Sequence, residues 1–396
     1  MIRRLRTSIV GLVVLGSTSM AALAMGVPAL AVPPDAASTG LSVGAVSGGI
    51  AADGESASTP ASLARERAAA RHGLVGATRY DWKAIAPARL PDGTSTRSLE
   101  SSVAGISNSG EVTGNVSRPG GLDPTPFIAS GQRSRWLDQS GLPNGAYATA
   151  ISPAGQVVGK MRGIDSFYVS WPVRGKRTLT ATPESYYGPY PGAVNSAGTV
   201  VGILASIKNS SLFYSARGRV TQVSAPKQAN FAVNGISEGG VAVGTADHPS
   251  YRMDLRYPEG VIFTAARAQL VKADDTSRAE AISPNGRYVV GRVGVTGFDT
   301  GGRAAWLSTT RKPVILDRSA GLLPRDVSNE GVVVGAVNGH AATWQRGALT
   351  DLNRRVRNLP SGWVLTDAVA ISHGGGLAVD AKSASGTTVA LKLTPR

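Results

Sequence analysis

The chain has 396 residues, among them 49 glycines, 23 prolines and no cysteine, and its 41 Lys and Arg against 26 Asp and Glu give a net charge of +15. The absence of cysteine excludes disulfides, thiolate metal sites, iron–sulfur clusters and cysteine nucleophiles. The four histidines lie far apart in the sequence, which leaves a zinc hydrolase unsupported, and we expect neither a metal nor any other cofactor. A hydrophobic fraction of 42% is sufficient for a folded core.

Residues 1–31 have the three parts of a secretory signal peptide. A basic start (residues 3–6) and an apolar stretch (9–25) precede Ala29-Leu30-Ala31, the small-x-small pattern that signal peptidase cleaves. A membrane-spanning helix is the alternative, but a Gly-Ser-Thr-Ser run interrupts the apolar stretch. No later segment is apolar enough to span a bilayer. We therefore expect a secreted, extracellular protein without a transmembrane segment after cleavage, and the loss of three arginines lowers its net charge from +15 to +12.

The next segment, residues 32–78, is rich in Ala, Ser, Gly and Pro and weakly charged. Such a composition cannot bury enough apolar surface to fold, so we expect a flexible leader. Within it, Thr59-Pro60 is a typical helix start and Gly73 a typical stop, which predicts a short helix over 60–72. The remaining residues, 79–396, form the predicted folded domain.

Seven copies of one pattern organise this domain. Each copy has a small residue, Ile or Val, Ser or Asn, two variable residues, Gly and an apolar run, and the copies follow one another at intervals of 42 to 46 residues. The hydroxyl or amide position is occupied by Ser107, Ser152, Asn195, Ser237, Ser283, Ser328 and Ser372. The turn glycines are Gly110, Gly155, Gly198, Gly240, Gly286, Gly331 and Gly375.

These residue types predict a β-hairpin. A Ser or Asn oxygen can accept a hydrogen bond from the N–H two residues further on, and the turn glycine supplies the positive φ that closes the hairpin. The apolar run favours a buried strand, which we expect to end at a second glycine. That glycine occurs in six units, and the seventh has valine instead (Gly114, Gly159, Gly202, Gly244, Gly291, Gly335 and Val379).

The second half of each unit predicts two more strands, the first of which bears aromatic residues that we expect in the core between sheets. Four short strands in about 44 residues match the period of a propeller blade. We therefore predict an all-β fold, a seven-bladed β-propeller of four-stranded blades. Residues 79–86 read as a strand, and we expect them to complete the last blade so that no open edge remains. An open β-solenoid, which would not need that strand, is the alternative.

The units resemble the extracellular HAF repeat, which joins Ala-Ile-Asn-x-x-Gly-x-Val-Val-Gly to His-Ala-Phe-x-Trp-x-x-Gly. Val327–Leu352 carries the best local match, with His340, Ala341, Trp344 and Gly347 followed by the trailing Asp-Leu. The resemblance covers about residues 80–393, although most units lack the His and several lack the Trp. It implies an exported, WD40-like propeller architecture and little about chemistry.

Ligand binding in a propeller concentrates on variable loops held by a rigid frame. Three connections, expected on one face, combine aromatic and basic residues. The candidate ligand-binding residues are Tyr186, Tyr187 and Tyr190 in 185–191, Tyr251, Arg252, Arg256 and Tyr257 in 248–257, and Arg354, Arg355, Arg357 and Trp363 in 353–363. Such side chains bind anions and sugars through bidentate hydrogen bonds and stacking.

We therefore expect a monomeric binding module for an extracellular or cell-envelope polymer or protein, with an anionic polymer, carbohydrate or peptide as its ligand. Nucleic acid is not an expected partner of an exported protein. The alternative is a glycoside hydrolase or polysaccharide lyase acting at the central channel, with Asp326, Asp274-Asp275 or His340 as candidate groups. A third possibility is that the domain is a structural spacer.

Overall fold

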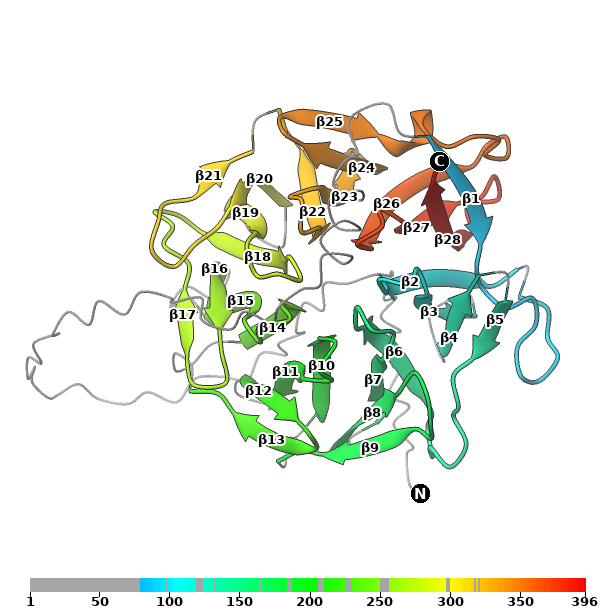
Figure 1. Ribbon diagram of the computed structural model, residues 1–396, viewed down its shortest axis with the longest axis horizontal. Helices are drawn as coiled ribbons and strands as arrows, with labels where there is room; N and C mark the ends of the chain where they lie inside the picture. Colours follow the sequence, from blue (N-terminus) through cyan, green and yellow to red (C-terminus); the bar gives the residue numbers. More distant parts are fainter. Residues whose placement is uncertain are drawn as a thin grey trace, which may run out of the picture. The chain divides into compact units, whose positions relative to one another are not determined.

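The computed structural model describes residues 79–396 except 97, 119–123, 132, 164–165, 184–186, 206–209, 225–229, 250–255, 297–299, 317 and 320. The predicted signal peptide (1–31), leader (32–78) and helix (60–72) lie outside these residues. The described chain forms seven four-stranded antiparallel sheets, arranged as the blades of a ring (Figure 1). No helix in this part of the chain is long and apolar enough to cross a membrane.

The blades are numbered here in chain order, and each is given from its innermost to its outermost strand. Blades one to three are β2 (Glu100–Ile106), β3 (Val112–Ser117), β4 (Thr125–Ser130) and β5 (Arg133–Trp136); β6 (Ala146–Ile151), β7 (Val157–Met161), β8 (Phe167–Trp171) and β9 (Thr178–Ala181); and β10 (Pro189–Val194), β11 (Val200–Ala205), β12 (Ser210–Ala216) and β13 (Arg219–Gln222).

Blades four to six are β14 (Asn230–Ile236), β15 (Ala242–Pro249), β16 (Arg256–Phe263) and β17 (Ala268–Leu270); β18 (Ser277–Ile282), β19 (Val289–Thr296), β20 (Thr300–Trp306) and β21 (Val314–Ile315); and β22 (Leu322–Val327), β23 (Val333–Val337), β24 (His340–Gln345) and β25 (Ala348–Asp351). Blade seven consists of β26 (Val364–Ile371), β27 (Leu377–Lys382), β28 (Thr388–Pro395) and β1 (Tyr80–Ala84), and η1 (Leu352–Arg354) precedes it.

The ring is closed by its first strand. β1 pairs antiparallel with β28, from Tyr80 opposite Pro395 to Ala84 opposite Leu391, and becomes the outermost strand of blade seven. The last repeat supplies only three strands of its own, so β1 satisfies an edge that would otherwise be open. The predicted propeller, its blade count and its closure by residues 79–86 are confirmed, and the open solenoid is excluded.

The repeated hairpin turn joins the first two strands of every blade. All seven turn glycines have positive φ, between 72° and 96°. In each turn the buried Ser or Asn accepts a hydrogen bond from the first residue beyond the turn, as when Glu111 N–H donates to Ser107 Oγ at 3.0 Å. This bond spans four residues, and five in blade five, where Tyr288 N–H donates to Ser283 Oγ. The expected bond two residues on occurs in blade six, where Glu330 N–H donates to Ser328 Oγ at 3.2 Å, and the bond common to all seven turns is the one that closes the whole turn.

The second glycine does not end a strand, contrary to the sequence expectation. Gly114 lies within β3 and Gly335 within β23, and both strands continue beyond them. Each of the six glycines lies opposite a β-bulge in the innermost strand, where a Cβ would approach a backbone carbonyl oxygen to 2.2 Å or less. Blade seven, which has Val379 at this position, carries two register shifts in its inner strand instead of one.

Aromatic side chains of the third strands fill the space between blades. Phe127, Phe213 and Phe263 are fully buried, and Phe263 packs edge-on against Tyr214 of blade three with ring centroids 5.8 Å apart. Burying one such side chain contributes roughly 2 to 3 kcal/mol. The predicted packing of aromatic residues between sheets thus gives the ring its apolar core.

Candidate binding surfaces

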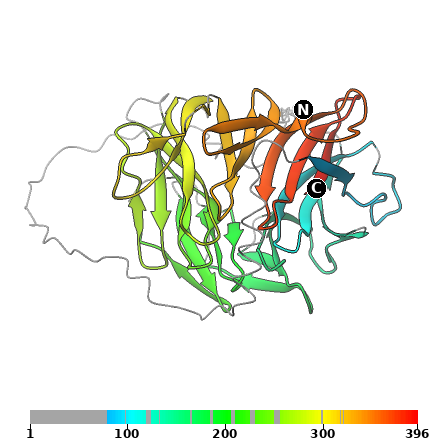
Figure 2. The ribbon, with the colours of Figure 1, turned by 45° about the horizontal axis from the view of Figure 1, so that its top comes forward.

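The connections of each blade divide between two faces of the ring. Because neighbouring strands are antiparallel, the repeated hairpins lie on one face, with the turns between third and fourth strands. The turns between second and third strands and the connections between blades lie on the other, here called the loop-rich face. In the turned view of Figure 2 the strands run between these faces. All three predicted binding segments belong to the loop-rich face.

Part of the predicted site lies outside the described residues, namely Tyr186, Tyr251 and Arg252. Arg256 and Tyr257 belong to β16, where their backbones pair with Pro249 and His248. The strands β15 and β16 therefore extend further than the sequence suggested, and the connection between them is limited to residues 250–255.

The arginine loop, defined as residues 352–363 between β25 and β26, carries the predicted residues Arg354, Arg355 and Arg357 on a fixed backbone. Tyr80 N–H donates to Arg355 O at 3.0 Å, and Arg357 N–H donates to Tyr80 O at 3.1 Å. These bonds attach the loop to the closing strand β1. The loop is therefore ordered by ring closure, although most of its residues are irregular.

Trp363 anchors the same loop. Its ring packs against Trp82 of β1 with centroids 5.8 Å apart, and Trp82 Nε1–H donates to the carbonyl oxygen of Asn358 at 3.0 Å. Trp363 is half-buried. Because its ring contacts β1, this tryptophan contributes to holding the loop in place, and the three arginines remain as its ligand-binding candidates.

The guanidinium groups of Arg354, Arg355 and Arg357 form no ion pair with any described residue. Arg354 and Arg357 are exposed and Arg355 is half-buried. Three cations within four residues that form no ion pair with described residues attract anions from solution. The arginine loop thus carries three positive charges on a fixed backbone.

A groove of about 670 Å³ lies beside the arginine loop on the outer strands of blade six. It is lined by Val337, Asn338, His340, Ala342, Leu349, Thr350, Asp351, Arg354 and Arg355. His340 Nδ1 lies 3.1 Å from Asp351 Oδ2. Although burial opposes it, hydrogen bonds from His340 and Asn353 hold the pKa of Asp351 below its usual value. The groove therefore combines two cations, a histidine–aspartate hydrogen bond and apolar walls.

The predicted tyrosine segment, residues 185–191, leads into β10 of blade three and contacts blade two. Tyr187 is 45% exposed, whereas Tyr190 lies in β10 and is half-buried. Lys160 Nζ of β7 lies 3.3 Å from the centroid of the Tyr190 ring. Tyr147 of β6 lies directly opposite Lys160 in the sheet and belongs to the same cluster. The sequence analysis predicted the tyrosines of residues 185–191 but neither Lys160 nor Tyr147.

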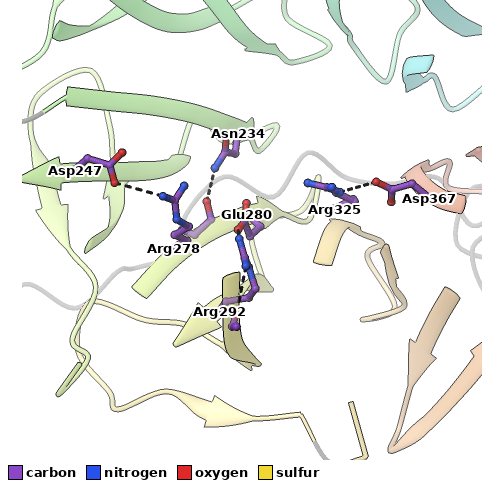
Figure 3. A network of polar contacts seen from close by, with 9 residues as sticks. Asn234, Asp247, Arg278, Glu280, Arg292, Arg325 and Asp367 are labelled. Atoms are coloured by element: carbon purple, nitrogen blue, oxygen red, sulfur yellow. Dashed lines mark hydrogen bonds and ion pairs between the residues drawn. The ribbon is translucent and has the colours of Figure 1, made fainter. Parts of the chain in front are cut away.

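Polar side chains also link the inner strands, both within a blade and between successive blades. Figure 3 shows the group in blades four to seven. Its bonds run from Asn234 to Ala279 O (2.8 Å), Arg278 to Asp247 (3.6 Å), Arg292 to Glu280 (2.8 Å) and Arg325 to Asp367 (2.9 Å). Asn234, Glu280 and Arg325 occupy the bulge position, two residues before the repeat's Ile or Val. The fixed distance of two residues from the Ile or Val could have identified these polar residues in the sequence.

The candidate catalytic groups do not converge on one site. Asp326 accepts the N–H groups of Val327 and of Ile371 in blade seven, at 2.7 and 2.9 Å, so it joins two blades. Asp274 forms an exposed ion pair with Lys312, and His340 lies on the outer groove. Within the described residues no group of three His, Asp or Glu is placed to hold a metal ion.

No family model matches this chain, and no curated protein matches it. Solved propellers do. A streptogramin B lyase aligns with a TM-score of 0.51 at 9% identity, over 80% of this chain and 98% of its own. The virginiamycin B lyase of Staphylococcus aureus gives 0.51 at 8%, over 80% and 99%.

The β-propeller domain of the Trilobed protease from Pyrococcus furiosus, which has an open velcro topology, gives a TM-score of 0.51 at 7% identity, over 75% of this chain and 97% of that one. Identities this low establish a shared fold and nothing about activity. Propellers support many functions, so function must be argued from the site.

Proposed function

We propose that this protein is a secreted binding module of the HAF-repeat type, which recognises an extracellular anionic polymer on its loop-rich face through the arginine loop. The observation that carries the proposal is the set of three guanidinium groups that form no ion pair with any described residue, on a backbone held by β1. A preorganised cationic site loses little conformational entropy when it binds. The excess of Lys and Arg over Asp and Glu favours the same class of ligand.

The HAF resemblance receives support from one contact. His340 and Asp351, two of the residues that carry the resemblance, hydrogen-bond to each other at 3.1 Å across β24 and β25. Asp351 Oδ1 also accepts the N–H of Asn353 at 2.9 Å and so caps η1. The His340–Asp351 pair therefore has a structural role, because Asp351 fixes the start of the arginine loop.

A catalytic role at the centre of the ring has less support. Glu280 and Asp367 each pair with an arginine, and Asp326 and Asp380 accept backbone N–H groups. Asp326, Asp367 and Asp380 are occupied in joining neighbouring blades and Glu280 in an ion pair within blade five, so a binding function is the simpler interpretation.

The test is a pull-down of the full mature chain on polygalacturonate, with neutral dextran as the matched polymer, across a salt series. We expect binding to polygalacturonate that weakens with salt and falls roughly tenfold or more in the triple variant R354Q/R355Q/R357Q. The control R133Q/R135Q/R219Q removes the same charge from exposed positions on β5 and β13. Equal loss in both variants, or no binding at low salt, would refute a specific role for the arginine loop.

A further inference from the structure

One cation on the inner strands lacks, among the described residues, the counter-charge that its one cationic equivalent has. The residue after the second glycine of each unit projects from the second strand, and it is Lys160 in blade two and Arg292 in blade five. Arg292 bonds through Nε and Nη2 to Glu280, at 3.1 and 2.8 Å. The position equivalent to Glu280 in blade two is Thr149, which carries no charge. The repeat thus supplies an internal comparison in which blade two has a cation at the same position but no carboxylate at the bulge.

Lys160 has no carboxylate partner among the described residues. Its Nζ lies 3.3 Å from the centroid of the Tyr190 ring, a cation–π contact with the next blade. Burial lowers the pKa of Lys160 to about 8. A half-buried ammonium that contacts a ring face, and forms no ion pair with a described residue, retains the capacity to bind an anion.

The groups around Lys160 are hydrogen-bond donors. Tyr147 lies directly opposite Lys160 in the sheet, and Lys160 Nζ lies over the Tyr190 ring. Burial, with a further contribution from Tyr190, raises the pKa of Tyr147. Burial raises the pKa of both phenols, so both stay protonated at neutral pH. An ammonium and two phenol O–H groups, with no carboxylate partner of the ammonium among the described residues, form a site for an acceptor that carries negative charge.

We propose that Lys160, Tyr147 and Tyr190 bind the carboxylate of an acidic sugar. The carboxylate takes the place that Glu280 fills in blade five, and the neighbouring tyrosine rings provide apolar faces for the sugar ring. Half-burial of all three side chains leaves them accessible from solution. The site lies between blades two and three, whereas the arginine loop joins blades six and seven, so each proposal can fail without the other.

The test is isothermal titration calorimetry of the full mature chain with D-glucuronate, and with D-glucose as the uncharged match. We expect glucuronate to bind and glucose to bind at least tenfold more weakly. K160M removes the ammonium, and T149E supplies the internal carboxylate present in blade five. We expect each to weaken glucuronate binding at least tenfold, although T149E retains the lysine. R133Q, at an exposed position of β5 that belongs to neither proposed site, is expected to bind glucuronate as the native protein does.

Thermal denaturation of each variant establishes that it is folded before its titration is interpreted. Undetectable glucuronate binding by the native protein would overturn the proposal. So would unchanged glucuronate affinity in K160M or T149E, or glucose binding of equal strength. Loss of glucuronate binding in K160M but not in T149E would also count against the proposal, because the glutamate of T149E should occupy the anion position and exclude glucuronate.

Discussion

The second glycine of the repeat is required by a close backbone contact. A Cβ on Gly335 would lie 2.0 Å from the carbonyl oxygen of Leu323, because the bulge at Arg325 brings the inner strand towards β23. No side-chain rotation relieves a contact with backbone. Sequence inspection found these glycines but assigned them to strand ends, since a bulge in the partner strand leaves no local mark on the strand that carries the glycine.

Gly335→Ala should therefore lower the free energy of unfolding by at least about 2 kcal/mol, through displacement of the inner strand. Gly374→Ala is the matched control, because an added Cβ there meets nothing within 4 Å, and it should stay within about 0.5 kcal/mol of the native protein. Urea denaturation measures both. Equal stability of the two variants would show that the close contact does not constrain the blade.

Asp380 is a buried acid at the junction of blades seven and one. It accepts the N–H of Val103 at 2.9 Å and lies opposite Asp367 in the sheet. Burial is the main cause that raises the pKa of Asp380 to about 8, and burial also raises that of Asp326 to about 6. A carboxyl whose pKa is higher in the folded than in the unfolded state binds more protons when folded, so stability declines as pH rises between the two values.

The free energy of unfolding should accordingly fall between pH 5 and pH 8. Asp380→Asn keeps an oxygen that can accept from Val103 but cannot ionise, and it should flatten this decline. Urea denaturation at pH 5, 6, 7 and 8 measures the slope. A native protein whose stability is constant or rises over this interval, or an Asp380→Asn variant with the native slope, would contradict the assignment.

At the scale of elements, the hairpin turn is the unit that was most predictable from the sequence. Its serine and glycine act within five residues, so their roles do not depend on the rest of the fold. Ser152 illustrates this: it is fully buried, and its Oγ accepts the N–H of Gln156 at 3.0 Å. Asn195 makes the equivalent bond in blade three with Thr199 N–H at 3.0 Å, so either residue type meets the geometric need.

Ser152→Ala leaves a buried N–H without its acceptor and should cost about 1 to 3 kcal/mol. Ser152→Asn restores an acceptor and should recover most of that loss. Both are measured by chemical denaturation of the full mature chain. An alanine variant as stable as the native protein, or an asparagine variant no better than alanine, would remove the hydrogen bond from the explanation of the repeat.

At the scale of the whole molecule, the ring brings together residues that no local pattern relates. The blade number and the closing strand could be predicted because each blade has one hairpin and the last has only three strands of its own. The contact of Lys160 with Tyr190, and that of Trp82 with Trp363, could not be predicted. Both join different repeat units and depend on how the sheets are placed about the axis. The arginines were found from composition, but their attachment to β1 was not.

Ring closure by β1 is the central claim, because it completes the fold and positions the arginine loop. Asp81 of β1 and Thr394 of β28 are opposite each other and exposed, within the Cα separation that a disulfide needs. Since the chain has no cysteine, the variant D81C/T394C contains a single pair of thiols. After mild oxidation of the folded protein, mass spectrometry should detect one intramolecular disulfide, and D81C/K382C should retain free thiols. Free thiols in D81C/T394C, or equal crosslinking of both pairs, would contradict a propeller closed by its first strand.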